Sequence, residues 1–165
     1  MFFIANHPIY NHPLPEGHRF PMLKYELLPK QLLHEGTAEC TDFYSPDSID
    51  LSLVHAVHTV SYVKALTELT LDAKAVRSIG FPLSAALVER ELRIAQGTVV
   101  GCNHALEHGI AFNIAGGTHH AFSDRGEAFC LLNDQAIAAQ YLINQKKCHK
   151  ILIVDLDVHQ GNGTA

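Results

Sequence analysis

The sequence predicts an α/β fold in which helices cover both faces of a parallel sheet. Two observations carry that prediction. Between residues 110 and 157 the chain reads as a strand, a helix and a second strand, and residues 151–154 are apolar at every position. Such a run is typical of a parallel strand buried on both faces. No linker or internal repeat divides the 165 residues, so we expect them to belong to a single domain.

The first third of the chain predicts a strand, a long turn region and several helices. Residues 2–5 form a short apolar run, and the prolines and glycine of residues 7–18 make a segment too long for a simple connector. Residues 22–33 predict a helix that is interrupted at Pro29. Ser45-Pro46-Asp47 is a helix-start signal, and residues 59–69 predict a further helix.

The clearest periodicity follows Pro82, where apolar residues recur at alternating steps of three and four. It predicts a long helix whose core-facing stripe is Ala85, Val88, Leu92, Ala95, Val99, Cys102 and Leu106. Residues 110–114 then predict a strand. Residues 133–144 predict a helix capped by Asn133 or Asp134, and residues 150–157 predict a buried strand.

Composition excludes several classes of protein. With 47% hydrophobic and 18% charged residues, the chain can bury a core. Its net charge of -5, without a cluster of Lys or Arg, argues against a direct nucleic-acid partner. No apolar run approaches the roughly 18 residues that a membrane span needs, and no signal peptide is evident. The four cysteines are far apart, which favours reduced thiols and a cytoplasmic location.

The end of the last predicted strand carries candidate metal ligands. If the strand alternation continues, Asp155, Asp157 and His159 lie on one face. Carboxylate and imidazole groups at the carboxyl end of a parallel strand suit zinc, and also iron, cobalt or manganese. The alternative is that both aspartates are caps or turn residues beyond the strand.

A second candidate site follows the strand predicted at residues 110–114. In Gly116-Gly117-Thr118-His119-His120, two glycines allow close approach of a ligand. Two adjacent imidazoles can take a proton from water and return it to a leaving amine. Alone, the motif would favour a solvated loop, because the chain has 12 histidines.

Together these motifs resemble the histone deacetylase and acetylpolyamine amidohydrolase family. The order Gly-Gly-x-His-His-Ala, Phe129-Cys130-Leu-Leu-Asn133-Asp134 and Asp155-Leu-Asp157-Val-His159-x-Gly is similar to that family's order. Arg19 with Met22 and His58-Thr59 with Tyr62 extend the resemblance toward the amino terminus, and Ser123-Asp124-Arg125-Gly126 is similar to the class IV branch. The resemblance implies an arginase/deacetylase-like fold, of which residues 1–165 are a truncated, amino-terminal part.

The resemblance also implies a role for each site residue. Asp157 and His159 would bind a catalytic Zn²⁺, or Fe²⁺, while the backbone of Asp155, Asp157 and His159 would help to bind K⁺. His120 would be the general base, supported by His119 with Asp155 behind it. The remaining assignments are Asn162 as the partner of His120, Phe129, Gly117 and Thr118 as tunnel lining, and Arg19 at the cavity through which acetate leaves.

Two positions depart from the pattern of many relatives. Asn162 replaces an aspartate, so His120 lacks a neighbouring negative charge and should act as a base at lower pH. Thr118 replaces a large aromatic residue, which predicts room for acyl groups longer than acetyl. The family's third metal ligand and its oxyanion-stabilising tyrosine lie beyond residue 165.

The leading hypothesis is a zinc-dependent hydrolase that removes acyl groups from lysine or from a small acetylated amine. Its expected partners are such a substrate and, for the chain itself, another copy or the missing carboxyl-terminal half. Two alternatives stay open. One is an inactive fragment, or a domain that binds metal or acyl-lysine without turnover; the other is a ureohydrolase-like enzyme with two manganese ions.

Overall fold

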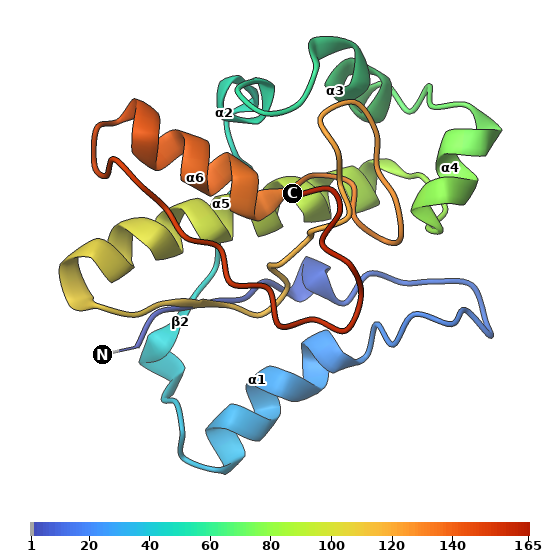
Figure 1. The fold of residues 1–165 in the computed structure, drawn as a ribbon. Helices are drawn as coiled ribbons and strands as arrows, with labels where there is room; N and C mark the ends of the chain where they lie inside the picture. Colours follow the sequence, from blue (N-terminus) through green and yellow to red (C-terminus); the bar gives the residue numbers. More distant parts are fainter. Residues whose placement is uncertain (1) are drawn as a thin grey trace.

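A short parallel sheet lies at the centre of the computed structural model, which describes residues 2–165 (Figure 1). β1 (Ile4–Ala5) is the middle strand, and β2 (Phe43–Tyr44) and β3 (Phe112–Asn113) pair with it on either side. Ile4 lies opposite Phe43 and Phe112. Helices flank this sheet, so the predicted fold class is confirmed. β1 and β3 are shorter than the strands expected at residues 2–5 and 110–114, and β2 was not predicted.

The long helix α5 (Ala85–His108) packs against β1 and β3. It begins where the Ser84 side chain accepts the backbone N–H of Leu87 at 3.1 Å and ends at Gly109. The middle of the predicted stripe is buried as expected, but its two ends, Ala85 and Leu106, are exposed. The prediction was wrong there because α5 extends beyond the elements that it packs against.

Helix α6 (Asp134–Asn144) lies along α5 on the same side of the strands (Figure 1). The sequence left Asn133 and Asp134 as alternative caps. The structure selects Asn133, whose side-chain oxygen accepts the N–H of Ala136 at 2.9 Å. The carboxylate of Asp134 is therefore available for other partners.

Helix α1 (Lys24–His34) lies on the other side of the strands (Figure 1). It continues through Pro29, so the predicted interruption was wrong. Proline removes one backbone hydrogen bond from a helix interior. An exposed ion pair between Glu26 and Lys30, 2.6 Å apart, spans this part of α1.

Short helices complete the described chain: η1 (Pro8–Tyr10), η2 (Cys40–Asp42), α2 (Leu51–His55), α3 (Val60–Thr67) and α4 (Ala73–Ile79). The helix expected after Ser45-Pro46-Asp47 starts later, because the carboxylate of Asp50 caps the N–H of Ser52 at 2.8 Å. α4 was not predicted. It begins at the capping residue Asp72 and ends at Gly80, which has a φ of 84°.

The buried strand expected at residues 150–157 is absent, since no β-ladder includes these residues in the described part of the chain. Leu152, Val154 and Leu156 are 84%, 65% and 91% exposed. Asp155 and Asp157 instead accept backbone N–H groups two residues further on, at 3.0 and 2.7 Å, and these bonds turn the chain.

Among residues 2–165, no helix combines the length and apolar character that crossing a membrane requires.

Candidate active site

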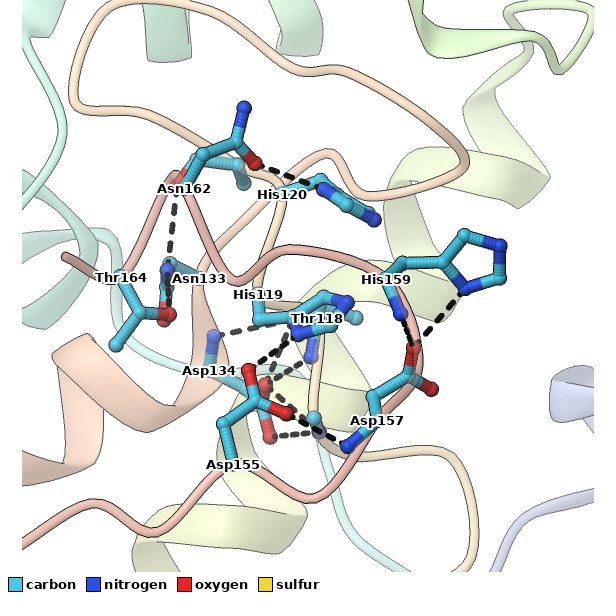
Figure 2. A network of polar contacts seen from close by, with 12 residues as sticks. Thr118, His119, His120, Asn133, Asp134, Asp155, Asp157, His159, Asn162 and Thr164 are labelled. Atoms are coloured by element: carbon cyan, nitrogen blue, oxygen red, sulfur yellow. Dashed lines mark hydrogen bonds and ion pairs between the residues drawn. The ribbon is translucent and has the colours of Figure 1, made fainter.

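Three segments converge beyond the carboxyl end of β3: residues 116–121, the start of α6, and residues 155–164 (Figure 2). The His119 carbonyl accepts the N–H groups of Gly163 and Thr164 at 3.0 and 3.1 Å. The Asn133 amide donates to the Thr164 hydroxyl at 2.9 Å. These contacts hold the last segment against the histidine pair, at the edge of the sheet where α/β proteins place their sites.

His119 faces Asp155, as Figure 2 shows, with Nδ1 and Oδ2 separated by 2.6 Å. The His119 side chain is 9% exposed, and that of Asp155 is 31% exposed. The hydrogen bond with His119 and the N–H of Asp157 lower the pKa of Asp155. Asp155 therefore remains a carboxylate and can orient the His119 ring.

His120 has a neutral partner. Its Nδ1 lies 2.9 Å from the side-chain oxygen of Asn162, and its ring centroid is 4.3 Å from that of His119. The two imidazoles thus differ in what supports them: an anion behind one and an amide behind the other (Figure 2).

Asp157 and His159 contact each other beside the pair. The Asp157 carboxylate lies 3.0 Å from His159 Nδ1, and the His159 ring centroid is 6.2 Å from that of His120. One oxygen and one nitrogen donor suit two positions of a zinc site. Among residues 2–165, no three His, Cys, Asp or Glu side chains are grouped closely enough to hold a metal. The proposed metal and potassium roles stay predictions.

The turn-residue alternative for the two aspartates is correct as far as their backbone contacts go. Each carboxylate accepts an N–H group two residues ahead. Each also has a further contact, Asp155 with His119 and Asp157 with the His159 ring. Turn formation and a role in the site are therefore compatible.

Asp134 holds the backbone before the histidines, a role that the sequence did not indicate. Its carboxylate, in a side chain only 1% exposed, accepts the N–H of Thr118 at 2.8 Å and that of Gly117 at 3.1 Å. The hydroxyls of Thr118 and Thr98 lie 2.7 and 2.6 Å away. Gly117 has a φ of 86°, a conformation that glycine adopts without strain.

A cleft of about 660 Å³ lies beside the histidine pair. Four of the predicted site residues line it, namely His119, His120, Asp157 and His159. Its walls include the predicted tunnel residues Gly117, Thr118 and Phe129, together with Arg19. Phe129 has a φ of 70° and donates its N–H to the Ile79 carbonyl at 2.6 Å. That bond supports a backbone conformation that is unfavourable for a phenylalanine.

The cleft also contains residues to which the sequence assigned no role. Lys24, Tyr25 and Arg90 line it, and so does Cys130. Burial raises the pKa of the Cys130 thiol to about 12, which argues against a thiolate nucleophile. Arg90 and Glu91 lie outside the predicted apolar stripe of α5, and no local pattern in the sequence indicated that they are buried.

The histone deacetylase domain model matches residues 18–165. The chain belongs to this family. An uncharacterized protein of Picosynechococcus sp. is 48% identical over 99% of the chain and 55% of its own length. The AcuC acetoin utilization protein of Bacillus subtilis is 33% identical over 69% of the chain and 31% of its own length. Histone deacetylase 2 of Arabidopsis thaliana is 29% identical over 88% and 39%.

Two crystal structures share the fold. An HDAC homologue from Aquifex aeolicus superposes with a TM-score of 0.81 at 23% identity, and an HDAC homologue complexed with SAHA superposes with a TM-score of 0.82 at 24% identity. Each alignment covers 98% of this chain and 46% of the other. The chain therefore spans between about a third and about half the length of these relatives.

Proposed function

We propose that this chain contributes the histidine pair and two metal ligands to a zinc-dependent hydrolase that removes acetyl or longer acyl groups from acyl-lysine or a related acylated amine. The observation that carries the proposal is that His119, His120, Asp157 and His159 line one cleft. Behind the histidine pair, Asp155 contacts His119 and Asn162 contacts His120. Membership of the histone deacetylase domain family supports the same reaction class.

The proposed chemistry assigns a task to each residue. Zinc, held by Asp157, His159 and a ligand outside residues 1–165, would supply Lewis-acid polarisation of the acyl carbonyl. His120 takes a proton from the attacking water and passes it to the leaving amine. His119, with the Asp155 carboxylate behind it, balances the charge that develops on His120. Phe129 and Gly117 form walls around the substrate side chain that carries the amide.

The test uses protein expressed from the complete reading frame, with metal content and acetyl-lysine peptide hydrolysis measured together. We expect about one zinc per chain and turnover that a chelator abolishes. His120→Ala should lower kcat by a factor of about 10³ while the zinc content stays unchanged. His108→Ala, on an exposed histidine at the end of α5, is the matched control and should keep full activity.

Other outcomes identify other functions. Zinc at one equivalent with no turnover on acetyl-lysine, propionyl-lysine or acetylpolyamine would favour a binding domain. Two manganese ions per chain would favour ureohydrolase-like chemistry. Equal activity in His120→Ala and the unmodified protein would remove the assigned base.

A further inference from the structure

A group of cationic side chains lines the cleft beside the histidine pair. Arg19, Lys24 and Arg90 all contribute to its wall, together with the aromatic residues Phe20 and Tyr25. Lysine 24 is the first residue of α1, and Arg90 projects from α5 on the opposite side of the sheet. The fold therefore brings these cations together from separate elements, although nothing in the composition of an acidic chain suggests such a group.

Aromatic rings hold the cations in place. Lys24 Nζ lies 4.8 Å from the centroid of the Phe20 ring and 5.0 Å from that of Tyr25. The Arg90 guanidinium carbon lies 4.9 Å from the centroid of the Tyr25 ring. The Arg19 guanidinium carbon lies 5.0 Å from the centroid of the Phe129 ring. Rings at these distances attract the cations and fix their positions without neutralising them.

Carboxylates balance this charge only in part, because Asp157 acts on Lys24 from beyond ion-pair distance. Within residues 2–165, neither Arg19 nor Lys24 has an acidic group within 4.0 Å. The nearest acid on α1, Glu26, is bound to Lys30 and to the amide of Asn11. Asp157, the aspartate that lines the cleft, is engaged by His159.

Arg90 is a different case, because it is only 2% exposed and is paired with the buried Glu91. Its Nε donates to the Tyr10 carbonyl at 3.0 Å. Arg90 is therefore a fixed part of the wall.

Partial burial, and next the charge of Arg90, lower the pKa of Lys24. An anionic group in the cleft would relieve this crowding of like charges.

We infer that the cleft takes an acyl group that ends in a carboxylate, such as glutaryl, with Lys24 and Arg19 as the partners of that carboxylate. The inference rests on the proposed function and narrows its substrate class. The reaction is ordinary amide hydrolysis: the C–N bond breaks, water supplies the oxygen of the new C–O bond, and the amine leaves with a proton. The products are the free amine and a dicarboxylate.

The small side chain of Thr118 is consistent with this substrate class. Its hydroxyl is directed to the Asp134 carboxylate, 2.7 Å away, and the residue is 8% exposed. A cleft of about 660 Å³ can hold an acyl chain of several carbons.

The test compares glutaryl-lysine and pentanoyl-lysine peptides, whose acyl chains have the same number of carbons and differ in the terminal charge. The protein from the complete reading frame, loaded with zinc, should show a kcat/KM about tenfold higher for glutaryl-lysine. Lys24→Gln should reduce this glutaryl-to-pentanoyl ratio about tenfold. Lys30→Gln is the matched control, because Lys30 lies on the same helix with a 66% exposed side chain, and it should leave the ratio unchanged.

An acetyl-lysine peptide and direct binding separate the possible failures. If the protein hydrolyses acetyl-lysine but its kcat/KM for glutaryl-lysine is no higher than that for pentanoyl-lysine, the inference is overturned and the proposed function stays intact. If no peptide is hydrolysed, the proposed function fails, and calorimetry with free glutarate still tests the cations; binding that is equal in the unmodified protein and Lys24→Gln would overturn the inference. If Lys24→Gln weakens acetate binding as much as it weakens glutarate binding, the cations serve the released product, and the inference is also overturned.

Discussion

At the scale of single residues, the two site histidines differ mainly in their partners. Asp155 is an anion 2.6 Å from His119, whereas Asn162 presents a neutral amide oxygen to His120. Both partners come from one segment, residues 155–162, and both contact the histidines through Nδ1. The chain therefore places partners of different charge behind two adjacent imidazoles.

The first residue-scale prediction concerns Asn162. In Asn162→Asp, a carboxylate beside His120 favours its protonated form, so the acid limb of the kcat/KM profile should move up by about one pH unit. A pH–rate series on the protein from the complete reading frame measures this. Acid limbs that coincide would show that residue 162 does not tune the base.

A second prediction concerns the pH dependence of stability. Because the pKa of Asp155 is lowered in the folded chain, its stabilising contribution is complete above the ordinary carboxyl value of about 3.9 and is lost as pH falls through the lower folded value. The Tm difference between the unmodified chain and Asp155→Asn should shrink as the pH falls below about 4. A difference that grows on acidification would contradict this sign.

The third prediction tests the buried carboxylate of Asp134. Asparagine would direct an amide N–H₂ at backbone donors that now share a carboxylate, so Asp134→Asn should lower the free energy of unfolding by about 2 kcal/mol. Asp124→Asn, at an aspartate whose side chain is 61% exposed, is the control and should change it by less than about 0.5 kcal/mol. Denaturant unfolding followed by circular dichroism gives both values.

At the scale of elements, α5 is closest to the sheet at one of its glycines. A Cβ on Gly97 would lie 2.9 Å from the Ala5 Cβ and 3.0 Å from the Tyr10 hydroxyl. A Cβ on Gly101, one turn later, would meet the Ala111 Cβ at 3.5 Å, an ordinary contact. The sheet therefore leaves no room for a Cβ at Gly97 of α5 but leaves enough at Gly101.

These glycines provide a paired prediction. Gly97→Ala should destabilise the fold by about 1–3 kcal/mol through overpacking. Gly101→Ala should be neutral or stabilising by up to about 1 kcal/mol, because alanine favours the helix and meets no close neighbour. Thermal unfolding of both variants measures the difference, and equal destabilisation would indicate that packing against β1 does not set the position of α5.

At the scale of the whole molecule, the last segment leaves apolar side chains in solvent. Leu152, Val154, Leu156 and Val158 are 84%, 65%, 91% and 93% exposed. Contiguous apolar surface of this kind favours association.

The prediction at this scale is that the 165-residue chain, studied alone, self-associates through residues 151–158. The double variant Leu152→Glu, Leu156→Glu should reduce the apparent mass in sedimentation velocity toward that of a monomer. Val60→Glu changes an exposed residue of α3 (63% exposed) and should have little effect. A monomeric unmodified chain at every concentration would refute the prediction.

From the sequence alone, the fold class, the middle of α5, the extent of α6 and the family could be predicted, because periodicity, caps and motif order are local properties of the chain. Tertiary structure decided the rest. Whether residues 150–157 pair as a strand depends on a neighbouring strand, which no local pattern specifies. The contacts of Asp134 and the meeting of Arg19, Lys24 and Arg90 likewise arise between segments far apart in sequence. Local chemistry names the residues that can act, but only folding determines which of them meet.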